Sequence, residues 1–249
     1  MLVHTAAAAI FAAYPEAWPW VLGMLGANHL ALLFATLSPR GNLLGPNLVR
    51  LPAAAARRGE ISLTFDDGPD PEVTPRVLDL LDQHQFKASF FCIGEKAAAQ
   101  PELVKEIARR GHSVENHSYH HHQAFALFGI SRLKQEVDAA QGALAAITGR
   151  APVFFRAPAG FRSPLLDPVL AARGLRYVSW TRRGFDAVSR NPRGILRRLT
   201  RGLAAGDVLL MHDSAPVVLA VLPGLLERVS AQGLKAVSLA TACASEPGE

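Results

Sequence analysis

The sequence predicts an α/β fold in which parallel strands alternate with crossover helices. From residue 60 onward, short apolar runs recur, segments with helical spacing separate them, and glycine or proline stands at most of the joints. Strands that alternate with helices in this way pair in parallel. The pattern fits both an open doubly wound sheet and a closed barrel. Because no glycine-rich dinucleotide fingerprint follows the first strand, a nucleotide-binding sheet is not favoured.

Seven strands are predicted where β-branched, aromatic and other apolar residues form short runs. Their expected ranges are 61–65, 87–93, 112–116, 152–156, 175–180, 207–212 and 234–239. Cys92, in the second of these runs, is expected in the core. The last five residues, 245–249, are polar and are expected to form a tail.

The helices are predicted from apolar spacing together with residues that begin or end helices. We expect Thr74 to cap the first of them, and Ser131 to cap a long helix that Gly149 ends. Asn191, followed by proline, opens a later helix. The other helices are expected at 101–110, 167–173 and 217–229.

The composition is that of a globular protein. The 249 residues are 49% apolar and 19% charged, which allows a sizeable core and excludes disorder for most of the chain. Two cysteines, Cys92 and Cys243, exclude a disulfide scaffold and a C-x-x-C site. The net charge is +5, but no block of five or six like charges occurs, so nucleic acid is not an expected partner.

The first 39 residues are hydrophobic and carry one formal charge, that of Glu16. Two apolar stretches, 2–13 and 18–37, are separated by prolines. The second just reaches the roughly 20 residues that a spanning helix requires, and its two tryptophans suit a membrane interface. Because no lysine or arginine precedes the apolar region, a cleaved signal peptide is not expected.

The sequence divides into a hydrophobic amino-terminal segment, 1–58, and an enzyme domain, 59–249. The amino-terminal segment is expected to associate with a membrane, either as one span or as an embedded helical hairpin. The alternative is a soluble hydrophobic hairpin that packs on the domain.

Polar clusters follow five of the predicted strands. Active residues of barrels and open parallel sheets gather at the carboxyl ends of the strands, so these clusters are expected to meet. The clusters are Asp66 to Pro69, Asn116 to His121, Arg156 to Gly160, Asp186, and His212 with Asp213.

Histidines and carboxylates in these clusters predict a metal site. The i, i+4 spacing of His117 and His121 would place both on one face of a helical turn, where they can bind one metal ion. Adjacent carboxylates directly after a buried strand, as at Asp66 and Asp67, are costly unless they have a function. One can complete a His-His-Asp site, while the other accepts a proton from the attacking water. A solvated histidine-rich turn is the alternative.

Four motifs together resemble the NodB-homology polysaccharide deacetylases, carbohydrate esterase family 4. They are TFDDGP at 64–69, HSYHH at 117–121, RAPAG at 156–160 and LLMHD at 209–213. The resemblance covers roughly residues 60–240. It implies a distorted (β/α)7 barrel and a metal-dependent hydrolase that removes an N-acyl group, most often acetyl, from an amino sugar.

The resemblance also assigns roles to the motif residues. The catalytic set is Asp66 as general base, Arg156 as the residue that orients it, His212 as general acid, and Asp186 as a partner of Arg156 or His212. The metal set is Asp67, His117 and His121, which would hold one divalent cation, zinc in most of the family, with cobalt or nickel as alternatives. The substrate set is Leu210 for the acyl methyl group, the backbone N–H of Ala159 for the oxyanion, and Pro158.

The chain departs from the family along the sugar groove. Ala159 stands where an aromatic residue is usual, and the D-x-x-D-W stretch aligns with 183–187. There Asp186 survives, Arg183 replaces an acid and Ala187 replaces the tryptophan. These changes affect the expected binding of a polymer substrate more than the expected metal-dependent hydrolysis.

Two substrate classes are expected. The family resemblance favours a cell-wall or exported polysaccharide, and the hydrophobic amino-terminal segment favours a lipid-linked or glycolipid amino sugar. The expected partners are therefore an N-acetylated glycan or glycolipid and a membrane surface, and the expected location is the cell envelope, in association with a membrane. The alternatives are a catalytically lapsed carbohydrate-binding protein and a hydrolase of a different amide or ester.

Overall fold

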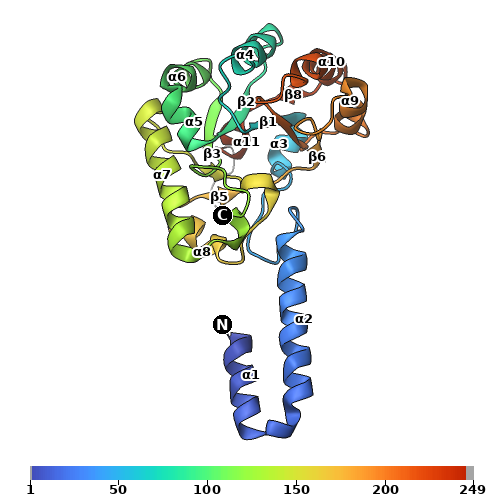
Figure 1. Ribbon diagram of the computed structural model, residues 1–249. Helices are drawn as coiled ribbons and strands as arrows, with labels where there is room; N and C mark the ends of the chain where they lie inside the picture. The colour runs from blue at the N-terminus through green and yellow to red at the C-terminus, as the bar shows by residue number, and fades with distance from the viewer. Residues whose placement is uncertain (1, 245–249) are drawn as a thin grey trace.

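A curled sheet of parallel strands forms the centre of the computed structural model, which describes residues 2–244 (Figure 1). The strands are β1 (Glu60–Asp66), β2 (Ala88–Cys92), β3 (Ser113–Asn116), β4 (Phe154–Phe155), β5 (Arg176–Tyr177), β6 (Arg182–Arg183), β7 (Val208–His212) and β8 (Lys235–Ala236). They run in the order β5-β4-β3-β2-β1-β7-β6, and β8 pairs with β1. With helices around this sheet, the distorted (β/α)7 barrel is confirmed. The sequence pattern does not predict β6.

Helices surround the sheet, most of them on its outer side. They are α3 (Ala53–Arg57), α4 (Thr74–Gln83), α5 (Gly94–Ala99), α6 (Pro101–Arg109), α7 (Ile130–Thr148), α8 (Leu166–Ala171), α9 (Pro192–Thr200), α10 (Val218–Ala231) and α11 (Leu239–Ala244). Short 3₁₀ turns lie at η1 (Pro15–Ala17), η2 (Phe125–Leu127) and η3 (Pro158–Gly160). Three of the helices, α3, α5 and α11, are not predicted by the sequence pattern, and α11 takes the end of the last predicted strand. The predicted polar tail lies outside the described residues.

Two of the predicted helix caps are wrong. Val73 precedes α4, because the hydroxyl of Thr74 is engaged elsewhere: it accepts a hydrogen bond from the Asp70 N–H and donates one to Asp213. Gly129, not Ser131, precedes α7. The cap at Asn191 is confirmed, since its side chain accepts a hydrogen bond from the N–H of Gly194 at 3.1 Å.

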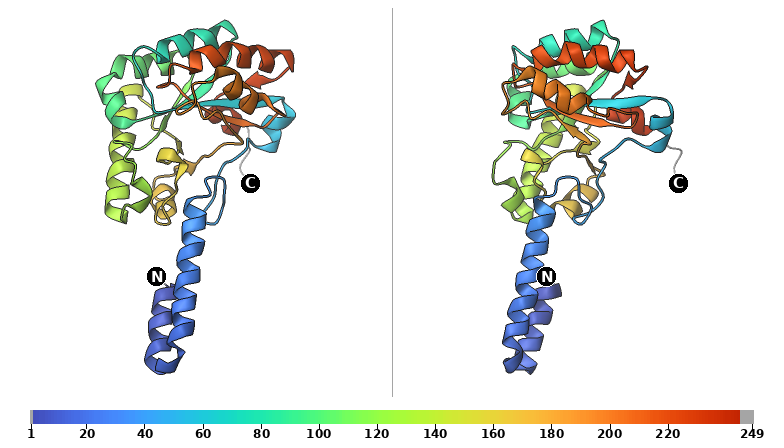
Figure 2. Two further views of the ribbon diagram at one scale, coloured as in Figure 1. Left: turned by 45° about the vertical axis from the view of Figure 1, so that its right-hand side comes forward. Right: turned by 90° about the vertical axis from the view of Figure 1, so that its right-hand side faces the viewer.

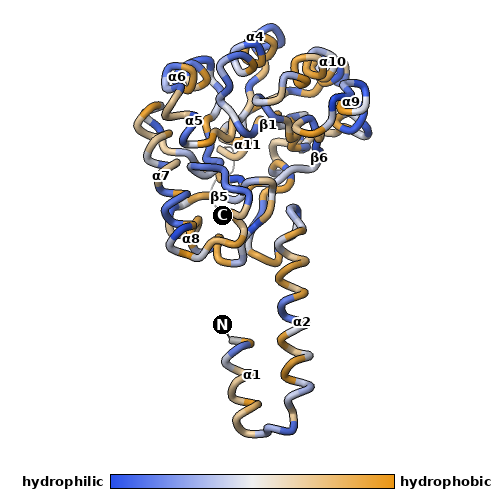
Figure 3. The backbone as a smooth tube through the Cα atoms, in the orientation of Figure 1, coloured by the Kyte–Doolittle hydropathy of each residue, from blue (hydrophilic) through white to orange (hydrophobic). Residues whose placement is uncertain are grey.

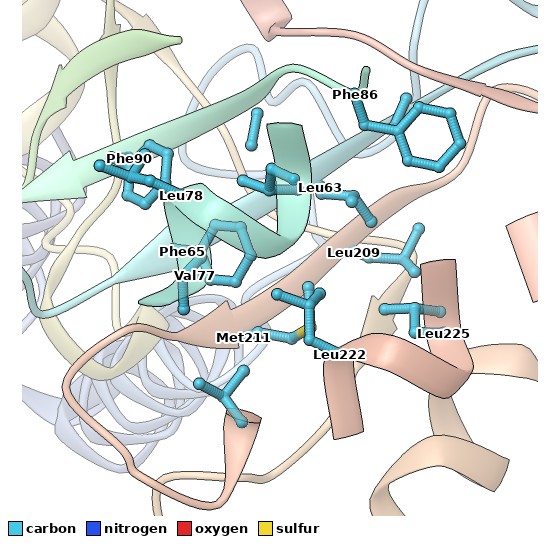
Figure 4. Packing of buried hydrophobic residues seen from close by; sticks show 14 of the residues in the cluster. Leu63, Phe65, Val77, Leu78, Phe86, Phe90, Leu209, Met211, Leu222 and Leu225 are labelled. Carbon is cyan, nitrogen blue, oxygen red and sulfur yellow. The ribbon is translucent and has the colours of Figure 1, made fainter. Parts of the chain in front are cut away.

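Alternation along β1 separates the core from the catalytic interior. Leu63 and Phe65 pack under α4 and α10 in the largest core cluster, which Figure 4 shows, and Cys92 belongs to the same cluster, as predicted. Successive side chains of a strand point to opposite faces of the sheet. Thr64 and Asp66 therefore face the barrel interior, where both are buried.

An apolar helical hairpin extends away from the sheet (Figures 1 and 2). It consists of α1 (Leu2–Ala13) and α2 (Trp18–Thr36), joined by η1. Figure 3 shows its predominantly hydrophobic colouring, and its large side chains face outward, with Trp20 81% and Phe34 66% exposed. Hence the hairpin does not pack on the domain. By length and composition, the segment Pro15–Thr36 is able to cross a membrane.

The chain that follows α2 returns to the domain beside the last strands. Arg40 donates a hydrogen bond to the carbonyl of Thr181 at 3.4 Å. Ser179 donates one to the Asn47 side chain at 2.9 Å, and Leu48 forms a β-bridge with Val178. The base of the hairpin is thereby attached to the strand ends that carry the site described next.

Candidate active site

Side chains from the ends of β1, β3, β4, β6 and β7 meet in one pocket of about 160 Å³. Its lining residues are Asp66, Asp67, His117, His121, Ala159, Gly160, Trp180, Arg183, Ala187, Leu210 and His212. Seven of the ten predicted site residues are among them. Arg156 and Asp186 are buried behind this lining, and Pro158 is buried in η3 without lining the pocket.

Asp67, His117 and His121 bring three potential ligand atoms within 4.8 Å of one another. Asp67 Oδ1 lies 3.2 Å from His117 Nε2 and 3.1 Å from His121 Nε2. The predicted helical turn is wrong, because residues 117–121 form a loop with positive φ at Ser118 and His121. The histidines converge through these two turns rather than through helical spacing.

The environment of these three residues suits a divalent cation. Asp67 Oδ1 is buried and accepts no hydrogen bond of normal geometry from the described residues. Burial opposes its ionisation, but the neighbouring imidazoles lower the pKa of Asp67, so the carboxylate is charged. Burial lowers the pKa of His121 to about 4, which leaves that ring neutral. An uncompensated carboxylate oxygen beside imidazole nitrogens is a donor set that binds zinc and similar metals.

His117 is oriented from behind by the backbone. Its Nδ1–H donates to the carbonyl of Arg156 at 2.8 Å, which directs Nε2 toward Asp67. This arrangement is typical of metal-binding histidines, because it fixes the tautomer that leaves Nε2 free to coordinate.

Asp66 is held by a fully buried arginine. Arg156 has no exposed surface, and its Nη1 donates to Asp66 Oδ1 at 2.6 Å and to Thr64 Oγ1 at 2.9 Å. Its Nη2 donates to the carbonyl of Ser179. The second oxygen of Asp66, Oδ2, lies 3.8 Å from His117 Nε2. One carboxylate oxygen is thus fixed while the other faces the metal-binding group.

His212 lies beside Asp66 on the adjacent strand, since the two are register partners in the β1–β7 pair. Its Nδ1 is 3.0 Å from Asp186 Oδ1, and its backbone N–H donates to Asp186 Oδ2 at 2.7 Å. Burial opposes protonation of His212, but the hydrogen bond and the charge of Asp186 raise its pKa. Of the two partners expected for Asp186, the structure selects His212.

The pocket also includes residues to which the sequence analysis assigned no role. Trp180 forms one wall, so close to Gly160 that a methyl group on that glycine would lie 2.4 Å from the indole. Arg183 and Ala187 line the same side. Trp180 ends a predicted strand, which is the signal that could have identified it.

Strained backbone concentrates around this pocket. Positive φ at residues other than glycine is uncommon, and it is sustained where the surrounding structure enforces it. Among residues 2–244 it occurs at Asp67, Gln85, Ser118, His121, Ala159 and Phe185. All except Gln85 belong to the loops that build the site.

The model of the family described as polysaccharide deacetylase matches residues 53–178, half of the chain. The chain belongs to this family. The matched range includes the Asp66–Asp67 and His117–His121 motifs of the polysaccharide deacetylases, while His212 lies beyond it.

Bacterial deacetylases are similar over most of the domain. A peptidoglycan-N-acetylglucosamine deacetylase of Bacillus cereus is 32% identical over 72% of this chain and 85% of its own length. A chitooligosaccharide deacetylase of Azorhizobium caulinodans is 33% identical over 64% of this chain and 76% of its own. For the enzyme PgdA of Listeria monocytogenes, the chain covers 41% of the relative, so that protein has further regions.

Solved structures agree with the fold. A family 4 carbohydrate esterase from Streptomyces lividans, in complex with acetate, superposes with a TM-score of 0.68 at 34% identity, over 72% of this chain and 91% of that one. A family 4 pseudoenzyme from Bacillus anthracis, 21% identical, reaches a TM-score of 0.72 over 79% of this chain and 68% of that one. Both structures therefore share the fold of this chain.

Proposed function

We propose that this metal-dependent amino-sugar N-deacetylase uses Asp66 as its base and His212 as its acid at the cell envelope. The observation that carries the assignment is their register on neighbouring strands β1 and β7, beside the Asp67–His117–His121 group. Hydrolysis of an amide requires proton removal from water and proton delivery to the leaving nitrogen. Two titratable groups with different environments, held side by side, can divide these tasks.

We assign the divalent cation to Asp67, His117 and His121, with zinc as the first choice and cobalt or nickel as alternatives. Three protein ligands of this type leave coordination positions open, as in catalytic sites. Bound there, such a cation supplies polarisation of the amide carbonyl and a lowered pKa for water.

The protein side chains then position and move the protons. Arg156 fixes Asp66 Oδ1, which leaves Oδ2 as the acceptor for the proton of the attacking water. Asp186 binds His212 Nδ1, so Nε2 faces the pocket and, when protonated, donates to the leaving amine. Afterwards the proton on Asp66 leaves with the acetate product or to solvent, and His212 is reprotonated.

The pocket size fits an acetyl group and one sugar face. Its volume of about 160 Å³ is below the range of roughly 300–1,000 Å³ that is usual for drug-sized ligands. We place the acyl methyl group against Leu210 and the oxyanion near the N–H of Ala159, whose φ of +56° turns the backbone at the pocket. Pro158 supports this turn from its buried position in η3.

The amino-terminal hairpin is assigned to a membrane. The 19 residues of α2 give a length of about 28 Å, close to the roughly 30 Å of a hydrocarbon core. Its exposed large side chains are apolar, and Arg40 follows four residues after its end on the domain side. We therefore propose residues 1–58 as the amino-terminal segment, whose hairpin associates with the membrane, and 59–249 as the enzyme. The substrate is an N-acetylated glycan or glycolipid at that surface.

The metal assignment is tested by comparing His121→Ala with the matched variant His120→Ala. His121 offers Nε2 to the metal group, whereas His120 Nδ1 pairs with Glu136 at 2.8 Å. Loss of bound metal and of N-acetylglucosamine oligomer deacetylation is expected only in His121→Ala, by metal analysis and acetate release. If His120→Ala lost the metal and His121→Ala kept it, the assignment would be wrong.

A further inference from the structure

Arg183 is a cation in the catalytic pocket that no carboxylate within the described part of the chain neutralises. It lines the pocket, and its Nε is buried without a hydrogen-bond partner among residues 2–244. Aromatic rings hold the guanidinium instead: its carbon lies 5.2 Å from the ring centre of Trp180 and 4.9 Å from that of Phe185. The side chain is therefore positioned, but its hydrogen-bonding capacity is unused.

Arg182, the other residue of β6, has a structural role and differs from Arg183 in its contacts. Arg182 forms an ion pair with buried Asp207 and donates to the carbonyls of Arg201 and Gly202. Side chains alternate across a strand, so Arg183 points to the opposite face, into the pocket. No side chain of residues 2–244 pairs with it there.

The acids of the pocket are already engaged. Asp66 pairs with Arg156, Asp186 with His212, and Asp67 belongs to the metal group. A partly buried charge without a partner is unfavourable, and an incoming anion would remove that cost. Arg183 is also the register partner of Leu210 in the β6–β7 pair, which places it beside the residue assigned to the acyl methyl group.

We propose that Arg183 binds an oxyanion of the substrate, a phosphate or a carboxylate, next to the N-acyl group. The proposal rests on the function assigned above and narrows it to amino sugars that carry a negative charge. The planar guanidinium matches an oxyanion with two parallel hydrogen bonds. Ala187 adds only a small side chain to the same side of the pocket, which leaves room for the anion.

The test compares three N-acetylated substrates in the metal-loaded full chain. N-acetylglucosamine 1-phosphate carries a phosphate, N-acetylmuramic acid carries a carboxylate, and the methyl glycoside of N-acetylglucosamine is neutral. The readout is the ratio of kcat/KM for each anionic substrate to that for the neutral one. Arg183→Ala is expected to lower this ratio by roughly 10- to 100-fold, mainly through KM, because a charge-assisted hydrogen bond is lost. Arg183→Lys should restore part of it.

A surface variant controls for general charge effects. Arg197→Ala removes the same charge from the exposed face of α9, outside the pocket, and should leave the ratio unchanged. If Arg183→Ala lowers the kcat/KM ratio of only one anionic substrate, that substrate shows whether Arg183 binds a phosphate or a carboxylate. If neither ratio changes while the neutral substrate is still deacetylated, the proposal is overturned and the deacetylase function stands.

Calorimetry decides the case in which no substrate is turned over. The function assigned above then fails, but binding of N-acetylglucosamine 1-phosphate and N-acetylmuramic acid can still be compared between the wild type and Arg183→Ala. Weaker binding of either anion in the variant supports the oxyanion site. Equal binding of both overturns it.

Discussion

Replacing Asp186 with asparagine should move the alkaline limb of the pH–rate profile to lower pH. The acid must be protonated to act, so the rate falls as pH rises through the pKa of His212. Asp186 raises that pKa through its hydrogen bond and its charge. Asparagine retains an oxygen that accepts from the backbone N–H of His212, but it has no charge. The rate of the variant therefore begins to fall at a lower pH.

The structure sets the size of this shift. His212 and Asp186 have side chains that are 7% and 0% exposed, and their atoms are 3.0 Å apart, so solvent screens the pair weakly. A hydrogen bond to a charged group contributes about 1.5–3 kcal/mol, and one pKa unit corresponds to about 1.4 kcal/mol. Loss of an interaction of this size should therefore move the alkaline limb clearly to lower pH.

The assay is kcat/KM for one N-acetylated substrate between pH 5 and pH 10, at measured metal occupancy. Asp138→Asn is the matched control, because it removes a carboxylate from a surface pair with Arg173, outside the site. The control should have the wild-type profile. An Asp186→Asn profile with a lower rate but an unmoved alkaline limb would refute the assignment of His212 as the acid.

Three further outcomes are expected. Asp66→Asn should keep the metal and lose at least about 100-fold in turnover, since the base is removed and no ligand is; metal loss would contradict the division of roles. Burial raises the pKa of Asp213 from 3.8 to about 7; the folded state then retains a proton that the unfolded chain releases, so stability falls as pH rises between these values. Asp213→Asn should therefore be more stable than wild type at pH 8, by about 4 kcal/mol, and similar at pH 4. Chemical denaturation measures both, and equal stability at both pH values would be the contrary result. Leu30→Glu, on the exposed surface of α2, should weaken co-flotation with phospholipid vesicles, whereas Leu127→Glu, on the exposed η2 turn, should not; equal flotation would argue against the hairpin as the membrane segment.

The sequence predicted the strands that are long and apolar, and the site residues that follow them. Burial on both faces keeps charge out of the middle of β1, so its carboxylates stand at the two ends, Glu60 at the amino end and Asp66 at the carboxyl end that builds the site. The strand β6 escaped prediction because it consists of two arginines and pairs with β7 only through tertiary contacts. The place of Arg183 in the pocket wall was missed for the same reason, whereas Trp180 ends a strand that was predicted.

The path of the chain between histidines was also beyond the sequence pattern. Spacing of four residues is the same in a helical turn and in the loop that is present, and only the positive φ at Ser118 and His121 distinguishes them. Likewise, the hydroxyl of Thr74 binds Asp213, which is distant in sequence, so the sequence around Thr74 could not predict this contact. Local signals therefore identified the correct residues while assigning them an incorrect local geometry.

The segment that follows the hairpin contacts a glycine of the pocket wall. Pro39, just after α2, lies so close to Gly160 that a methyl group on that glycine would be 3.3 Å from the proline ring, and Gly160 lines the pocket beside Trp180. Arg40 is attached to the carbonyl of Thr181, two residues before Arg183. If α2 enters a membrane, the oxyanion site at Arg183 is held near the lipid surface, where a charged and lipid-linked amino sugar would present its phosphate. The contacts of Pro39 and Arg40 thus fix the connection between the hairpin and the domain beside the pocket.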